Sequence, residues 1–134
     1  MPGGDTSSRI FYDTSATTYY FIGSGSASRA KQLTGRTTTA SILTWSFPEN
    51  TVCVVGGNLT ITAYTSGTIV LQVSWTDESS AARTATLTSG NSAASYNATP
   101  ITITVKAATV VTVQTTGTFS ATYNTSGFLT VLGG

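Results

Sequence analysis

Apolar and polar residues alternate one by one along much of this chain, and this pattern constrains the fold more than any other feature. The clearest example is residues 69–76, Ile-Val-Leu-Gln-Val-Ser-Trp-Thr, in which every odd position is apolar. A period of two places one set of residues on one side of a β-strand, whereas a helix repeats every ~3.6 residues. No stretch combines the helical period with capping residues, so the sequence predicts an all-β protein.

Turn residues divide the chain beyond residue 38 into about eight or nine short strands. Gly56-Gly57 separates two apolar runs, Ser66-Gly67 predicts a tight turn, and Gly127 opens the last strand. Short strands with regular turn signals are typical of a β-sandwich or barrel, which we expect over residues 39–134. Polar or small residues predict two longer loops, at 77–82 and 89–99.

The first 38 residues form a separate zone that holds four of the six basic residues and much Gly and Ser. Residues 9–12 and 17–22 predict a β-hairpin, followed by a flexible linker and an extended connector at 29–38. We therefore divide the chain into a hairpin arm with its linker, residues 1–38, and the sandwich. A lone hairpin is marginal in water, so its apolar residues need the main domain or another chain to pack on. The candidate anchors are Ile10, Phe11, Tyr12, Tyr19, Tyr20 and Phe21.

Charge is scarce, and this argues against several classes of function. Charged residues are 8% of the chain, the net charge is +1, and there is no basic run, so we expect neither nucleic-acid nor membrane-surface binding. No apolar run approaches the ~18 residues of a membrane span. The N-terminus also lacks a secretory pattern, and the single Cys53 is unpaired, so we expect synthesis in a reducing cytoplasm.

The residues needed for catalysis or metal binding are absent or scattered. The chain has no histidine, and one cysteine cannot build a thiolate metal site. Serine and threonine nucleophiles need a base, but Lys31 and Lys106 stand far apart and Glu49 lies in a predicted turn. We expect a protein that is not an enzyme and that uses no cofactor or metal.

The composition favours a protein that has partners. Thr and Ser are 46 of 134 residues, and on alternating strands they fall mostly on the outward side. A sheet with few charges has little protection against edge pairing. We expect an assembly to cover the edges and one face; the alternative is a stable sandwich whose hydroxyl groups suffice for solubility.

Several single residues admit a functional and a structural interpretation. Asp77 and Glu78 face Arg83 across a predicted loop, and two carboxylates favour an ion pair over a Ca²⁺ site, which wants six to eight oxygens. Cys53, in an apolar run, is expected to be a buried small side chain. The candidate sugar-stacking aromatics are Tyr64, Trp75, Tyr96 and Tyr123, and the candidate receptor-contact loop residues are Asp77, Glu78, Asn91 and Tyr96.

Five short segments resemble a domain common in tailed-bacteriophage structural proteins. They are Val73–Glu78, Ala82–Thr84, Pro100–Ile103, Thr115–Phe119 and Tyr123–Asn124. This domain is similar to the jelly roll of the tumour necrosis factor and complement-globular-head superfamily, which typically forms trimers. Residues 9–23 resemble the hairpins of phage fibre and appendage proteins.

The resemblance implies a single jelly-roll β-sandwich with a hairpin arm, in a homotrimer located in the virion. The expected partners are other copies of the chain and the major capsid protein or another virion protein. As a capsid decoration or head-fibre protein, it would dock on the shell through the arm. The alternatives are a receptor-binding fibre tip that contacts carbohydrate, and a bacterial surface filament subunit.

Overall fold

The computed structural model describes residues 8–13, 18–23 and 26–132 as β-strands and their connections, with no helix among them. The strands are β1 (Ser8–Asp13), β2 (Thr18–Gly23), β3 (Ser26–Arg36), β4 (Ser41–Ser46), β5 (Thr51–Gly67), β6 (Ile69–Thr76), β7 (Ala82–Gly90), β8 (Ser95–Asn97), β9 (Ile101–Val105), β10 (Val110–Thr116) and β11 (Phe119–Val131). The prediction of an all-β protein is confirmed.

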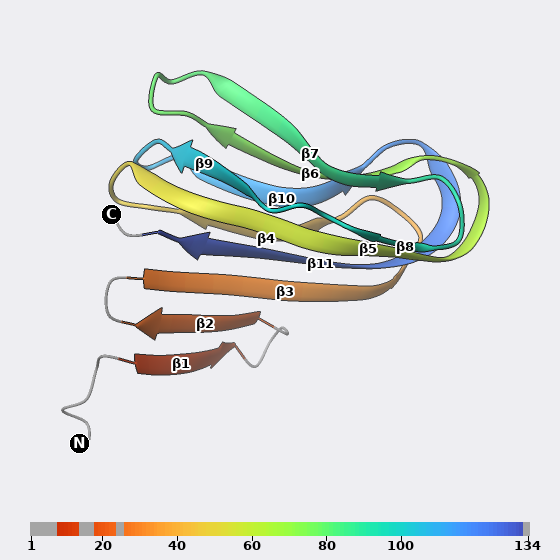
Figure 1. Cartoon of the computed structure of the whole chain (residues 1–134), viewed down its shortest axis with the longest axis horizontal. Helices are drawn as coiled ribbons and strands as arrows, with labels where there is room; N and C mark the ends of the chain where they lie inside the picture. Colours follow the sequence, from red (N-terminus) through yellow and green to blue (C-terminus); the bar gives the residue numbers. More distant parts are fainter. Residues whose placement is uncertain (1–7, 14–17, 24–25, 133–134) are drawn as a thin grey trace.

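The strands form two antiparallel sheets that pack face to face (Figure 1). The larger sheet has the order β1-β2-β3-β11-β5, with both β8 and β9 pairing with the far edge of β5, and the smaller sheet has the order β4-β10-β6-β7. From β3 onward, early strands pair with late ones in a nested series: β3 with β11, β4 with β10, β5 with β9 and β6 with β7. This nesting over two sheets is the jelly-roll arrangement, so the predicted fold class is confirmed.

The core lies between the sheets and is made mostly by every second residue of the sandwich strands. Val73 and Val113 lie opposite each other on β6 and β10, and Val55 and Leu129 do so on β5 and β11; all four are fully buried. A second cluster at the other end contains Leu59, Ile61, Ile69 and Tyr123. The period-two pattern of the sequence therefore corresponds to the inward and outward sides of the strands.

Two glycine positions that predict strand ends instead lie inside long strands. Residues 52–55 and 59–63 belong to one strand, β5, and Gly127 lies within β11, directly opposite Gly57. A Cβ atom on Gly57 would lie 2.3 Å from the carbonyl oxygen of Ser126, and one on Gly127 would lie 2.9 Å from Val113. Glycine at these two positions leaves space for neighbouring backbone and core side chains. The strand ends predicted at Gly57 and Gly127 are therefore wrong.

Two other predicted connections contain strands. The segment 29–38 lies mostly in β3, which pairs with β11, and the loop 89–99 includes β8. β3 fills one edge of the jelly roll although it belongs to the zone 1–38. The division at residue 38 remains a prediction, and β1 with β2 is the part that lies outside the sandwich.

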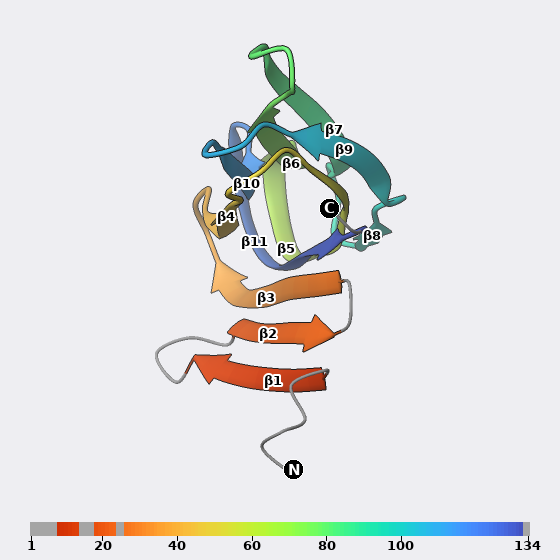
Figure 2. The same cartoon turned by 90° about the vertical axis from the view of Figure 1, so that its left-hand side faces the viewer.

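The predicted N-terminal hairpin is present as β1 and β2, and it extends the larger sheet beyond the sandwich. Tyr19 of β2 pairs with Ala30 of β3, and Tyr12 of β1 pairs with Tyr19. Figure 2 shows β1 and β2 continuing the sheet below β3, with no second sheet over them in the described part of the chain.

Candidate interaction surface

The larger sheet has one side that faces away from the core, and its register aligns residues from the hairpin to the far edge. One row runs from Ile10 through Phe21, Ser28, Thr130 and Val54 to Thr102. The next row runs from Tyr12 through Tyr19, Ala30 and Phe128 to Gly56. Because paired residues of an antiparallel sheet share a side, these rows define one continuous surface.

No charged residue occupies a position on this side in the described residues of the seven strands. We call it the uncharged face. Its apolar positions are Ile10, Tyr12, Tyr19, Phe21, Ala30, Val52, Val54, Ala63, Phe128 and Leu132, and Ser, Thr, Asn, Gln and Gly fill the rest. Val52 is 38% exposed and Leu132 is 55% exposed, so parts of this surface are apolar and accessible.

Phe128 lies on the uncharged face, opposite Gly56 and with its ring beside that glycine. A Cβ atom on Gly56 would lie 2.6 Å from the Cε2 and Cζ atoms of the Phe128 ring, so the ring covers this glycine. Pro100 lies beside the same position, at 3.4 Å from that Cβ atom. Glycine at residue 56 therefore lets the aromatic ring lie against the backbone of the sheet.

The charged residues of β1 and β3 occupy the opposite side of the same sheet. Arg29 pairs with the core residue Leu129 and Lys31 with Gly127, so both are on the core-facing side. The Arg29 guanidinium lies 5.0 Å from the centroid of the Trp45 ring and donates a hydrogen bond to the carbonyl oxygen of Thr44 in β4. Arg29 therefore covers the open edge of β4 where the sheet leaves the sandwich.

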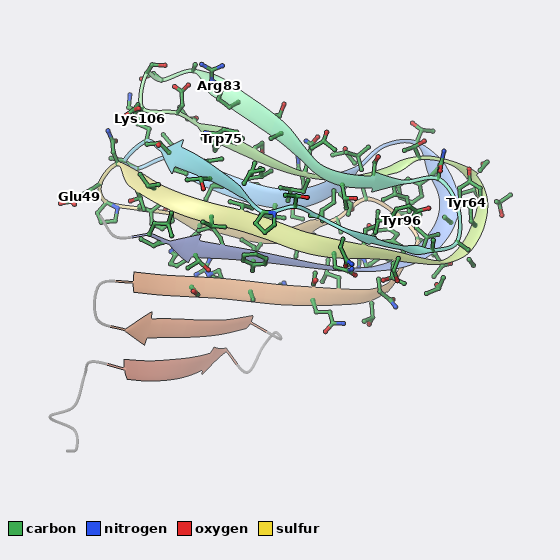
Figure 3. The ribbon with its side chains drawn as sticks, viewed as in Figure 1. Glu49, Tyr64, Trp75, Arg83, Tyr96 and Lys106 are labelled. Carbon is green, nitrogen blue, oxygen red and sulfur yellow. The ribbon has the colours of Figure 1, made fainter. Side chains whose placement is uncertain are left out.

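Most remaining charges gather at one end of the sandwich. Figure 3 shows Glu49, Arg83 and Lys106 at this end, with Tyr64 and Tyr96 at the other. Asp77 accepts hydrogen bonds from the Ser79 hydroxyl, the backbone amides of Ser79 and Ala81, and Arg83 Nε at 2.6 Å. These bonds, led by the Ser79 hydroxyl and Arg83, hold the pKa of Asp77 well below its usual range.

The predicted ion pair between Asp77 and Arg83 is confirmed, and it joins the two ends of the loop between β6 and β7. Glu78 is exposed in the same loop. Asn91 and Tyr96 lie beyond the other end of β7, which spans nine residues. The predicted receptor-contact residues therefore form two separate groups, and receptor binding by either group stays a prediction.

The candidate sugar-stacking aromatics take structural positions. Tyr96 packs on Gly90, where a Cβ atom would lie 2.4 Å from its ring, and its hydroxyl lies 2.7 Å from the Ser92 hydroxyl. Trp75 packs against the core, and the Tyr64 hydroxyl donates to the carbonyl of Gly67. Tyr123 is fully buried, so its choice as a sugar-stacking residue, which requires exposure, is wrong.

The described residues contain no group of three or more His, Cys, Asp or Glu side chains that could hold a metal ion. Cys53 is buried, as predicted, and burial raises the pKa of its thiol to about 11, which keeps it in the unreactive neutral form. No helix in the described ranges is long and apolar enough to cross a membrane.

Comparison with known proteins finds similar folds at low sequence identity. No family description matches the chain, and no curated protein matches it. An infectious bursal disease virus structure (Gx strain) is 16% identical with a TM-score of 0.45, covering 92% of this chain and 32% of that one. The xylan-binding CBM22-1 domain of Paenibacillus barcinonensis Xyn10C is 12% identical with a TM-score of 0.39, covering 97% and 85% of the two chains.

A third similar structure is TmCBM61 bound to β-1,4-galactotriose, at 12% identity and a TM-score of 0.38, covering 92% of this chain and 88% of that one. The chain spans about a third of the length of the viral chains it matches. These similar folds include viral capsid and carbohydrate-binding domains. The jelly-roll assignment here depends on the strand order of this chain itself.

Proposed function

We propose that this chain is a non-enzymatic structural protein of a tailed-bacteriophage virion. In this proposal it is a trimeric capsid decoration or head-fibre protein whose N-terminal hairpin docks on the shell. The observation that carries the proposal is the continuation of the larger sheet, with its uncharged face, out of the sandwich and across β1 and β2. The resemblance of the five sandwich segments and of residues 9–23 to phage structural proteins supports the same assignment.

The uncharged face has the chemistry of a docking surface. Because β8 and β9 share the far edge of β5, the sheet is six strands wide, and at ~4.8 Å between strands of about six residues the face measures about 24 by 20 Å. That is roughly 480 Å² before side-chain relief is counted, which is smaller than the about 800 Å² a side of a standard stable interface. A partner can cover this face without burying a charge, and burying apolar residues there contributes binding free energy.

The test uses native virus particles and particles depleted of the protein. The chain should be a component of the native particle, and added protein should bind the depleted ones. Deleting residues 2–24 removes β1 and β2 but keeps β3, and we expect this variant to remain a trimer that no longer binds. Absence from the particle, or full binding by the deleted chain, contradicts the proposal.

A matched pair of substitutions separates the uncharged face from a general charge effect. Ala30 on β3 and Ala82 on β7 are both exposed, and they lie on the outer sides of the larger and the smaller sheet. We expect Ala30→Lys to weaken particle binding at least about tenfold, because it buries an unpaired charge. Ala82→Lys should leave binding unchanged. Equal effects of the two would show that the face itself is not the docking surface.

The filament-subunit alternative has one structural observation in its favour, the unpaired edge of β1. A filament needs a second, different surface that accepts this edge, so that contacts repeat without closing. Purified protein at increasing concentration should then form fibres visible by electron microscopy. Closed oligomers of fixed size would argue against a filament and agree with the virion proposal.

A further inference from the structure

β1 is the outermost strand of the larger sheet, and among the described strands only β2 pairs with it. An edge strand presents unpaired N–H and C=O groups that can pair with another chain. The ladders from β1 to β2 and from β2 to β3 contain no register shift. The edge is thus a regular six-residue strand with no proline.

The other sheet edges of the described molecule are interrupted. Arg29 donates to the carbonyl oxygen of Thr44 on β4, and the ladder of β7 shifts register opposite Leu71 and Gln72. The far edge of the larger sheet is split into β8 and β9, with Pro100 immediately before β9. Bulges, split strands, proline and charged side chains are the devices that prevent edge pairing. β1 has no bulge, is not split and contains no proline. It does carry two charged residues, Arg9 and Asp13.

The charges of β1 are arranged for pairing with an identical strand. The strand carries Arg9 and Asp13 at equal distances from Phe11. If two copies run antiparallel about a two-fold axis centred on Phe11, Arg9 of each copy lies opposite Asp13 of the other. Ile10 then lies opposite Tyr12 of the second copy, and the two Phe11 residues face each other. Opposite charges, aromatic pairs, and aromatic with β-branched pairs are favourable cross-strand neighbours.

Within the chain the same two charged residues face uncharged ones. Arg9 lies opposite Ile22 and Asp13 lies opposite Thr18 in the ladder between β1 and β2. The second ladder, with another copy, would thus give each of them an oppositely charged cross-strand neighbour. This charge complementarity favours a second copy of the chain as the partner that pairs with the edge of β1.

The same two-fold axis agrees with the uncharged face. An axis perpendicular to the sheet relates antiparallel strands and keeps each side of the sheet on the same side. Ile10 and Tyr12 lie on the uncharged face, whereas Arg9, Phe11 and Asp13 lie on the other side. Both copies would therefore present their uncharged faces in one direction, free to lie on one surface.

We propose that β1 pairs with β1 of a second copy in the antiparallel register centred on Phe11, joining two larger sheets edge to edge. The contact is separate from the trimer of the proposed function and does not depend on a virion. If the proposed function also holds, this contact links neighbouring molecules on the shell.

Disulfide trapping in the full chain tests the register. In the proposed pair the two Phe11 residues are directly opposite, with Cα atoms ~4.5–5.5 Å apart, which suits a disulfide. We expect Phe11→Cys to give disulfide-linked dimers under mild oxidation. Ile10→Cys is the matched control, because the two Ile10 residues are diagonal neighbours at ~7–8 Å and should not link. Cys53 is fully buried and contributes little background.

Charge reversal in the Phe11→Cys background tests the partner. Arg9→Asp alone and Asp13→Arg alone each place like charges opposite each other twice, and should lower the disulfide yield at least about tenfold. Mixing the two variants restores opposite charges at both positions, so mixed disulfide dimers should return to the parent yield. A misfolded hairpin could not be rescued by mixing.

The outcomes separate this proposal from the proposed function. Equal linking of Phe11→Cys and Ile10→Cys, or no recovery in the mixture, overturns the β1 pairing. Neither result affects particle binding, which is measured with the Ala30→Lys and Ala82→Lys variants. Conversely, recovery by mixing supports the pairing even if the protein binds no particle.

Discussion

The hydroxyl of Tyr123 organises a buried polar cluster at one end of the sandwich. It donates a 2.6 Å hydrogen bond to the carbonyl of Thr38 and lies 2.7 Å from the Thr115 hydroxyl. The amide of Ala40 donates to the same Thr115 oxygen at 3.0 Å. These bonds hold the connection between β3 and β4 against β10 and β11. Alternation along the sequence predicts the side of a strand on which Tyr123 lies, but not how deeply the neighbouring strands cover it.

We expect Tyr123→Phe to destabilise the fold without changing its shape. The substitution keeps the ring, but it removes the buried bond to the Thr115 hydroxyl and the partly buried bond to the Thr38 carbonyl, which costs about 1–3 kcal/mol. Tyr64→Phe is the control, because the bond from the Tyr64 hydroxyl to Gly67 is exposed and should cost less. Urea unfolding followed by tryptophan fluorescence measures both. Equal losses of unfolding free energy in the two variants would show that the buried cluster contributes no more to stability than the exposed bond of Tyr64.

At the scale of elements, the sequence predicts most strands. It misplaces strand ends where a glycine lies inside a strand and not in a turn. The alternation of residues 69–76 and 101–105 corresponds to β6 and β9. Gly57 and Gly127 predict turns because glycine is common there, yet both lie in paired strands. The reason is that side chains of the other sheet, such as those of Leu71 and Val113, fill the space above them. Only the packing of the two sheets contains that information.

The two glycines should respond differently to alanine. A Cβ atom on Gly57 meets the Ser126 carbonyl oxygen at 2.3 Å, and a backbone atom cannot move without disturbing the ladder. On Gly127 the nearest atom is Val113 Cγ1 at 2.9 Å, which a side-chain adjustment can relieve. Overpacking costs about 1–3 kcal/mol, and we expect Gly57→Ala at the upper end and Gly127→Ala at the lower. Thermal unfolding of both variants checks the order, and the reverse order would contradict this account.

Across the whole molecule, charge is absent from both broad outer sides in the described chain. On the smaller sheet, the positions in register with Thr112 are Ser74 and Thr44, which are polar. On the larger sheet, apolar residues such as Val52 and Phe128 are more frequent. Scarce charge in the sequence predicts that partners cover some surface. It could not predict which face, because the rows join residues from strands far apart in the chain, such as Ala30 and Phe128.

The two proposed contacts should respond oppositely to salt. Docking through the uncharged face has no charge pairs to screen, so particle binding should stay constant or strengthen between roughly 0.05 and 0.5 M NaCl, over which the Debye length falls below ~5 Å. Sulfate should strengthen it further, because sulfate favours apolar burial. The β1 pair includes Arg9 opposite Asp13 twice, so its disulfide yield in the Phe11→Cys variant should fall over the same range. Co-sedimentation with particles measures the first and non-reducing gels the second. Particle binding that weakens steeply with salt would mean that charged residues, and not the uncharged face, make the contact.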